Sequence, residues 1–208
     1  MRKILVVNPK GGCGKTTIAS NLASYYAVWG VPTALVDCDP QQSSLEWLQQ
    51  RPADYEPIHG ISGVRGKTAY PDGIRRVVVD APARTTLKQV EHLINDANVV
   101  LIPVLPSPID IRAAARFIGE LLQDRMARKR RIGVLANRVR ENTLIFGKLD
   151  TFLNGVGIPL VTHLRDTQNY IRAAERGIGV FEMAPSLVDT DIEQWRPLIR
   201  WVEKKKKK

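Results

Sequence analysis

Short, continuously apolar runs alternate along the chain with longer segments in which apolar residues recur at helical spacing. Apolar runs of this kind are typical of parallel strands that are covered on both faces. They predict strands at residues 3–8, 33–37, 76–80, 99–103, 132–137 and, less regularly, 160–164. The helical spacing predicts helices at residues 16–29, 43–50, 85–96, 109–127, 144–153, 167–175 and 191–203.

This alternation predicts an α/β fold, in which a doubly wound and mostly parallel sheet carries helices on both faces. Ligand groups of such a fold lie at the carboxyl ends of the strands. Residues 51–73 are rich in Pro, Gly and Tyr, and there we expect loops and a short strand around residues 57–61. Residues 1–203 are expected to form one domain, and the lysine run 204–208 a basic tail, either functional or an inert addition.

A glycine-rich turn follows the first predicted strand and leads into the first predicted helix. Gly11, Gly12 and Gly14 let backbone N–H groups converge on an anion, and the helix that follows adds its positive dipole end. Cys13 and Thr17 belong to the same turn. Lys15 is placed to reach the β- and γ-phosphates of a nucleotide, and the hydroxyl of Thr16 suits Mg²⁺. This is the pattern of a phosphate-binding P-loop.

A second lysine, Lys10, stands at the start of this turn, where a mononucleotide site does not need one. The run KGGCGKTT resembles the deviant Walker A box of the ParA/MinD family of ATPases, with Pro9 where the generic box has glycine. The resemblance implies a P-loop fold that binds ATP or ADP with Mg²⁺. It also implies that Lys10 crosses a homodimer interface to contact the partner's nucleotide. The alternative is a solvated lysine beside an ordinary P-loop.

Two carboxylates follow the second predicted strand. The run Asp37-Cys38-Asp39-Pro40-Gln41 resembles the family's DxDPQ box. By that analogy Asp39 positions the attacking water, and Asp37 either belongs to the metal shell or supports the site. The alternative is an acidic turn at the end of a strand.

Asp80 ends the third predicted strand, which is the Walker B pattern, and is expected to bind Mg²⁺ through water. Ala81, Pro82, Ala83 and Arg84 follow, so the glutamate that serves as general base in many faster P-loop ATPases is missing. We therefore expect slow turnover that awaits an activator. Arg84 either contacts a partner or DNA, or is simply exposed.

Asn137 ends a later strand, where related ATPases use an asparagine to recognise the adenine edge; a turn asparagine is the alternative. The second half of the chain is rich in arginine, and relatives bind DNA through basic residues of this half. The candidates are Arg138, Arg140, Arg165, Arg172, Arg196 and Arg200. Contacts of this kind go to phosphate and carry no sequence preference. Solvated surface is the alternative for each arginine taken singly.

The net charge is +10 and the pI about 9.9, which favours an anionic partner. Five of these charges belong to the lysine run, so about +5 remains on the body. Ile192, Trp195, Ile199 and Val202 recur at helical spacing in the last predicted helix. This stripe is expected to pack on the core, leaving Arg196 and Arg200 outside; a membrane-surface helix is the alternative.

We expect a cytoplasmic, nucleoid-associated protein, because the chain opens without a signal peptide or a long apolar run and has only two cysteines. The first predicted strand begins at residue 3, which leaves no room ahead of it for a DNA-reading helix-turn-helix. The two cysteines and three histidines lack metal-ligand spacing. The absence of a CxxC pair argues against an iron–sulfur reductase.

The resemblance implies a switch-like ATP hydrolase of the ParA type. ATP would close a homodimer that holds DNA non-specifically, and a ParB-like or other adaptor would stimulate hydrolysis and release. The output would be segregation or positioning of a plasmid, a chromosome or a protein cargo. One alternative is a MinD-like ATPase that acts at the membrane, and another is a nucleotide-binding scaffold without turnover.

Overall fold

The computed structural model describes the chain except residues 65–67, 141–150, 152, 156 and 205–208. Within the described residues, seven strands form a single parallel sheet in the order β3-β2-β4-β1-β5-β6-β7. Their bounds are β1 Arg2–Val6, β2 Thr33–Asp37, β3 His59–Ser62, β4 Arg76–Asp80, β5 Val99–Val104, β6 Arg131–Val139 and β7 Leu160–Arg165. The expected doubly wound α/β fold is confirmed.

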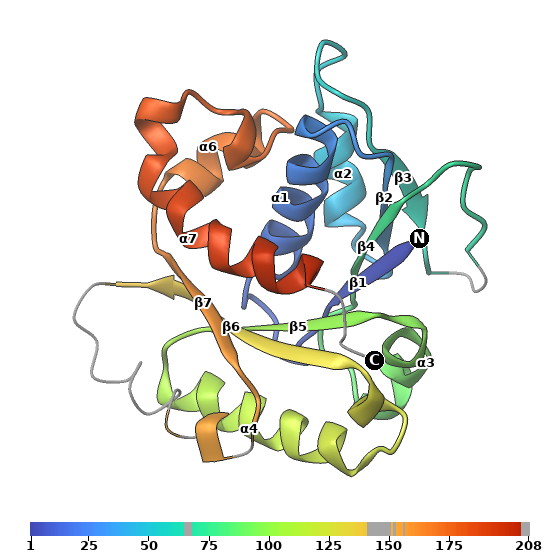
Figure 1. The fold of residues 1–208 in the computed structure, drawn as a ribbon, viewed down its shortest axis with the longest axis vertical. Helices are drawn as coiled ribbons and strands as arrows, with labels where there is room; N and C mark the ends of the chain where they lie inside the picture. Colours follow the sequence, from blue (N-terminus) through green and yellow to red (C-terminus); the bar gives the residue numbers. More distant parts are fainter. Residues whose placement is uncertain (65–67, 141–150, 152, 156, 205–208) are drawn as a thin grey trace.

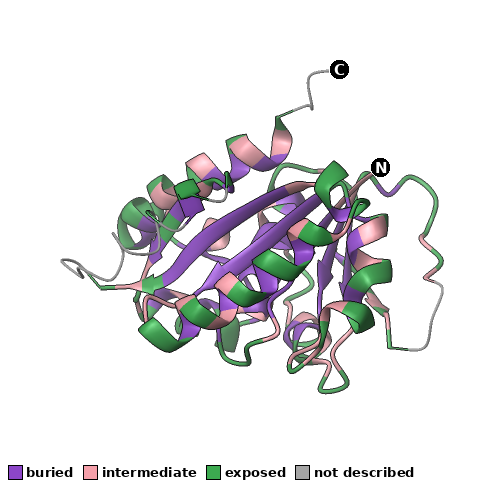
Figure 2. Ribbon diagram, turned by 90° about the horizontal axis from the view of Figure 1, so that it is seen from below, coloured by how far each residue is buried: buried purple, intermediate pink, exposed green. Residues whose placement is uncertain are grey.

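Helices cover both faces of the sheet (Figure 1). On one face lie α1 Lys15–Val28, α2 Ser43–Gln49, α6 Asn169–Glu175, α7 Pro185–Glu203 and the short 3-10 helix η2 Val180–Glu182. On the other face lie α3 Leu87–Asp96, α4 Pro108–Gln123 and η1 Ala127–Lys129. Each face has its own apolar core, and Figure 2 shows the strands buried between helices whose outer surfaces are exposed.

Several predicted boundaries differ from the structure. The last helix begins at Pro185, six residues before its predicted start, because proline is favoured in the first turn of a helix. Helix α4 ends at Gln123 and a separate turn leads into η1, so the prediction of one helix to residue 127 is wrong. The short strand expected around residues 57–61 is β3. Of the helix expected over 144–153, only residues 151 and 153 are described.

The apolar stripe of α7 packs inward. Trp195, Leu198 and Val202 are fully buried in the same core as α1, while Arg196 and Arg200 stay exposed. The core interpretation of this stripe is therefore confirmed, and its apolar face is not free to lie on a membrane.

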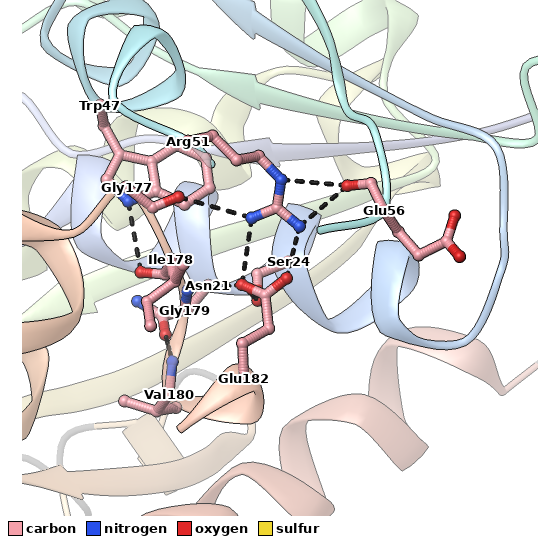
Figure 3. A network of polar contacts seen from close by, with 10 residues as sticks. All are labelled: Asn21, Ser24, Trp47, Arg51, Glu56, Gly177, Ile178, Gly179, Val180 and Glu182. Carbon is pink, nitrogen blue, oxygen red and sulfur yellow. Dashed lines mark hydrogen bonds and ion pairs between the residues drawn. The ribbon is translucent and has the colours of Figure 1, made fainter. Parts of the chain in front are cut away.

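A buried polar network ties α2 to α1 and η2 (Figure 3). Arg51, just after α2, forms an ion pair with Glu182, and their side chains are only 5% and 2% exposed. Glu182 also accepts hydrogen bonds from Ser24 of α1 and from the Gly179 N–H, both at 2.8 Å. Trp47 of α2 donates to the Ile178 carbonyl at 3.3 Å. These contacts hold α2 in place, and α2 directly follows the Asp37–Gln42 loop.

Candidate nucleotide site

The glycine-rich turn connects β1 to α1 at the carboxyl edge of the sheet. Gly12 and Gly14 have positive φ angles of 77° and 93°, which glycine adopts without strain. A Cβ at Gly14 would lie 2.1 Å from Asn137 Nδ2, so only glycine fits there. Gly14 also caps α1 without a side-chain hydrogen bond, and the first turn holds no acidic residue. The first N–H groups of α1 are thus available to an anion.

The two lysines of this turn have different environments. Lys15 is buried, and its Nζ donates to the carbonyls of Asn8 at 3.1 Å and Lys10 at 3.3 Å. Lys10 is exposed at the rim, and its backbone is held through its carbonyl and through its N–H, which donates to Asn8 Oδ1 at 2.9 Å. Among the described residues, the ammonium of Lys10 has no side-chain partner in its own subunit. Asn8, which sequence reasoning missed, therefore holds the start of the loop.

Asp80 lies directly beside this turn because the register pairs it with Val6 of β1 and with Asp37 of β2. Its Oδ2 accepts a hydrogen bond from the Thr16 hydroxyl at 2.7 Å. Its Oδ1 is buried and has no partner among the described residues. Burial raises the pKa of the Asp80 carboxyl to about 7, with the charges of Asp37 and Asp39 adding to the effect.

A carboxylate oxygen left buried and unpaired is costly unless a cation or donor satisfies it. A hydroxyl and a carboxylate side by side are hard oxygen groups of the kind that Mg²⁺ prefers, with water and phosphate completing its shell. Thr16 and Asp80 therefore fit the magnesium site that the sequence predicts.

Asp37 is fully buried and its carboxylate is fully engaged. Oδ1 accepts the Asp39 N–H at 2.9 Å, and Oδ2 accepts the Ser44 N–H at 2.8 Å and the Ser44 hydroxyl at 2.6 Å. The side chain thus organises the Asp37–Gln42 loop and the start of α2. This geometry favours the supporting role over direct metal ligation.

Asp39 connects two loops. Its Oδ1 accepts the Gln41 N–H at 3.0 Å within its own loop, and its Oδ2 accepts the Ala83 N–H at 2.7 Å beyond β4. The next N–H, of Arg84, donates to the Pro9 carbonyl at 2.9 Å. Arg84 has a positive φ of 55°, a backbone angle that residues other than glycine rarely adopt. The segment after β4 is thereby held by both the P-loop and the Asp39 loop.

Asn137 lies near the carboxyl end of β6, and its side-chain amide contacts the P-loop. Its Nδ2 donates a hydrogen bond to the Cys13 carbonyl at 2.9 Å and so helps to hold the P-loop in place. The residue also lines a hollow of about 420 Å³ together with Thr17, Arg138, Thr167 and Tyr170. A hollow of this size beside the start of α1 suits a nucleoside. Adenine recognition by Asn137 stays a prediction.

The DNA candidates separate into two groups. Arg138, Arg172, Arg196 and Arg200 are exposed. Arg140 is exposed and pairs with Asp166 at 3.2 Å. Arg165 instead forms a two-pronged ion pair with the fully buried Asp191 of α7, at 2.6 and 3.0 Å. Its guanidinium serves the packing of α7 on β7, so a role of Arg165 in binding DNA phosphate stays a prediction that this ion pair disfavours.

The cysteines are structural. Burial raises the pKa of both thiols, to about 12 for Cys38, so neither is poised to ionise. No cluster of three or more His, Cys, Asp or Glu that could hold a metal occurs in the described part of the chain. The described helices include none long and apolar enough to cross a bilayer.

Comparison with known proteins identifies the family. The profile described as CobQ/CobB/MinD/ParA nucleotide binding domain matches residues 4–180. The chain belongs to the ParA/MinD family. It is 30% identical over 194 residues to maintenance of carboxysome distribution protein A of Halothiobacillus neapolitanus, covering 86% of this chain and 87% of that protein.

Two further likenesses agree. Protein ParA of Rhizobium radiobacter is 29% identical over 177 residues, covering 77% of this chain and 78% of the relative. The ATP complex of an McdA variant from Cyanothece shares the fold, with a TM-score of 0.73, 14% identity, and coverage of 100% of this chain and 99% of that one. The chain is thus a nucleotide-binding ATPase of this family, related to proteins that position cargo.

Proposed function

We propose that this ATPase is a ParA-like switch that forms an ATP-dependent sandwich dimer, binds DNA non-specifically and hydrolyses ATP when a partner protein stimulates it. ATP and Mg²⁺ would occupy the site at the carboxyl edge of the sheet. The observation that carries the proposal is the contrast between the two lysines. Lys15 is buried within its own P-loop, whereas the ammonium of Lys10 stands exposed at the rim.

A cation displayed at the edge of a phosphate site can stabilise a nucleotide held opposite to it. If Lys10 reaches the partner's triphosphate, ATP binds the dimer better than the monomer, which is the only way a ligand can drive dimerisation. A charge supplied from a second subunit acts on the transferred phosphoryl group as an arginine finger does. The same contact would couple assembly to hydrolysis.

Within one subunit, the residues divide the chemistry among them. Lys15 and the N–H groups at the start of α1 would bind the phosphates, and Thr16 and Asp80 would hold Mg²⁺, which polarises the phosphoryl oxygens. Asp39 would orient the attacking water. In the structure its carboxylate already accepts the Ala83 and Gln41 N–H groups. A carboxylate whose two oxygens already accept N–H groups is not free to hold a water, which supports slow turnover awaiting an activator.

The proposed output is movement or spacing of a cargo through an adaptor protein, of the ParB type or another. One relative is named for carboxysome distribution and another is a ParA. A protein cargo and a plasmid or chromosome are therefore both within the proposal, and the adaptor would decide between them. A MinD-like role at the membrane has less support, because the apolar stripe of α7 is buried.

The decisive experiment replaces Lys10 with alanine. Lys10→Ala should leave ATP affinity of the monomer nearly unchanged, because Lys10 makes no contact within its own P-loop through its ammonium. It should weaken the ATP dimer by roughly 100-fold or more, as expected for loss of a buried charged contact. Light scattering after size exclusion, with ATP and in an Asp39→Ala background to prevent turnover, measures the dimer.

Lys15→Ala is the matched control, since it removes a lysine of the same loop. It should abolish ATP binding, as measured by calorimetry, and the ATP-dependent dimer should be lost as well. An ATP-dependent dimer of normal stability in Lys10→Ala would refute the role in trans. Normal hydrolysis by Asp39→Ala would refute the assignment of that carboxylate.

A further inference from the structure

A basic surface lies at the edge of the sheet opposite to the nucleotide site. Strands β4, β1, β5 and β6 are adjacent, and all run in the same direction. Their amino ends therefore meet at one edge, on the side of the molecule that carries α3 (Figure 1). We call the charged residues at these strand starts, in the turns before them and at the end of α7 the amino-edge surface. Its basic members are Arg2, Lys3, Arg75, Arg76, Arg125, residues 128–131 and Lys204.

This surface holds more than half of the excess charge of the chain, +6 of the net +10. Its ten basic residues face four acidic ones, Asp72, Asp96, Asp124 and Glu203. Four more lysines follow Lys204 in the sequence. Apart from these residues and the amino-edge surface, the chain has 17 basic and 17 acidic residues, which cancel. The positive field of the protein is therefore concentrated at one pole.

The fold keeps these like charges close together despite their repulsion. Arg2 and Arg76 are Cα partners on neighbouring strands, and they share Glu203 as an acidic partner, at 3.8 and 2.7 Å. Burial and the nearby charge of Arg2 lower the pKa of Arg131, which stacks on Trp201. Like charges on adjacent strands destabilise a sheet. Glu203 thus compensates part of the positive charge gathered at this edge, and the excess remains.

We propose that the amino-edge surface binds the phosphate backbone of double-stranded DNA. The proposal rests on the DNA binding in the proposed function and moves its main contacts away from the six arginine candidates between Arg138 and Arg200. Seven of the ten basic residues are arginines, which pair with phosphate through two N–H groups at once. Arg76 and Arg130 also contact Glu203 and the Asn95 carbonyl of their own subunit, whereas Arg75 and Arg125 are exposed.

The same construction disfavours a lipid surface as the occupant. Membrane-surface binding normally uses a helix whose apolar face enters the bilayer. The helix that ends at this surface is α7, and its Trp195, Leu198 and Val202 are fully buried in the core. What remains at the edge is a rigid array of cations, which suits a polyanion with regularly spaced charges.

The amino-edge surface lies far enough from the nucleotide site for DNA and nucleotide to bind at the same time. The nucleotide site lies at the carboxyl ends of the strands, and the amino-edge surface at their amino ends. A strand of five residues such as β1 spans about 17 Å. A dimer closed over the nucleotide sites would therefore leave an amino-edge surface open on each subunit, at the two opposite ends of the dimer.

Two triple variants with equal charge change test the assignment. The first is Arg75→Gln, Arg125→Gln and Arg128→Gln, three exposed residues of the amino-edge surface. The matched control is Arg172→Gln, Arg176→Gln and Arg196→Gln, exposed on α6, directly after it and on α7. Both are made with and without residues 205–208. Light scattering with ATP and a melting curve verify that each variant folds and dimerises.

The readout is fluorescence anisotropy of a labelled duplex of arbitrary sequence with ATP, over a range of salt concentrations. The amino-edge triple should bind at least 10-fold more weakly and lower the salt slope by about 2 to 3, near 0.9 for each phosphate that the protein no longer neutralises. The control triple should bind within about 2-fold of the unmodified chain.

The reverse pattern, or unchanged binding in both triples, would overturn the amino-edge assignment while leaving non-specific DNA binding intact. If the unmodified chain fails to bind DNA in any nucleotide state, the DNA component of the proposed function falls, and this assignment with it. A parallel assay with phosphatidylglycerol vesicles completes the design. Loss of vesicle binding without loss of DNA binding in the amino-edge triple would identify lipid as the occupant and overturn the proposal.

Discussion

Asp80 is a single residue whose ionisation links the site to the stability of the protein. Its pKa is raised from the ordinary value of 3.8 to about 7, chiefly by burial. Between these values the folded state keeps a proton that the unfolded state has lost, so the free energy of unfolding falls as the pH rises from about 4 to about 7. Above pH 7 this effect is complete.

Asp80→Asn removes the titration and keeps an oxygen that can accept the Thr16 hydroxyl. Without nucleotide or Mg²⁺, we expect the variant to match the unmodified protein near pH 4 and to exceed its stability by about 2 to 4 kcal/mol at pH 8. Urea unfolding across this range measures the difference. Stability curves that stay parallel from pH 4 to pH 8 would contradict the raised pKa. Added ATP and Mg²⁺ should stabilise only the unmodified protein.

At this scale the sequence predicts residue types well and their partners poorly. The P-loop glycines, Thr16 and Asp80 are recognisable because each stands at a short distance in sequence from an apolar strand. The hydrogen bonds of Asp37 cannot be predicted in this way, since its partner Ser44 lies beyond a loop that first has to fold. Arg165 and Asp191 are 26 residues apart, and only the packing of α7 on β7 brings them together.

Among the elements, the Arg51–Glu182 ion pair joins α2 to η2 and, through Ser24, to α1 (Figure 3). Removing one partner of a buried pair leaves an uncompensated charge in the interior. We therefore expect Glu182→Gln to lower the free energy of unfolding by about 3 kcal/mol or more. Urea unfolding followed by circular dichroism measures it.

A double variant separates charge from packing. Arg51→Met combined with Glu182→Leu leaves no unpaired charge, so it should cost less than the sum of the single changes. Asp96→Asn is the matched control for an exposed pair, because Asp96 is 63% exposed opposite Lys3, and it should change stability by less than about 1 kcal/mol. Equal losses for Glu182→Gln and Asp96→Asn would mean that burial of the first pair has no energetic effect.

Element type was predictable for strands such as β4 and β5, which are continuous apolar runs, and for helices such as α3 and α4, which have an apolar stripe at helical spacing. The ends of helices and strands were harder to predict from the pattern. The first turns of α7 carry Ser, Asp and Thr, and its apolar stripe becomes regular only near Ile192, so the pattern places the start too late. Strand β6 continues to Val139, past Asn137, because pairing with β7 extends it across register shifts.

At the scale of the whole molecule, the order of the strands in the sheet brings together residues that lie far apart in the sequence. The basic residues of the amino-edge surface come from the first residues of the chain, from residues 75–76, from residues 125–131 and from the end of α7. They become neighbours only through the strand order β4-β1-β5-β6. The six arginine candidates from Arg138 to Arg200 stand out only because the second half of the sequence is rich in arginine, which is a weaker criterion than proximity in the fold.

This arrangement also predicts how ATP and DNA influence each other. The two proposed surfaces lie at opposite ends of the same strands, so a monomer provides no shared contact through which one ligand could alter the other. A dimer closed over the nucleotide sites adds no shared contact either, because its two amino-edge surfaces face away from each other, so we expect little coupling free energy between ATP and DNA. In the Lys10→Ala variant, which should not dimerise, saturating DNA should leave the affinity for a fluorescent ATP analogue within about 2-fold.

In the dimer-competent Asp39→Ala protein, the same DNA should likewise leave the affinity for the analogue within about 2-fold. Titrations of the analogue with and without duplex DNA, at one salt concentration, measure both values. Strengthening by at least 5-fold in the dimer-competent protein alone would show that one DNA contacts both subunits of the dimer. Since the two amino-edge surfaces face away from each other, that result would place the DNA on another face of the dimer.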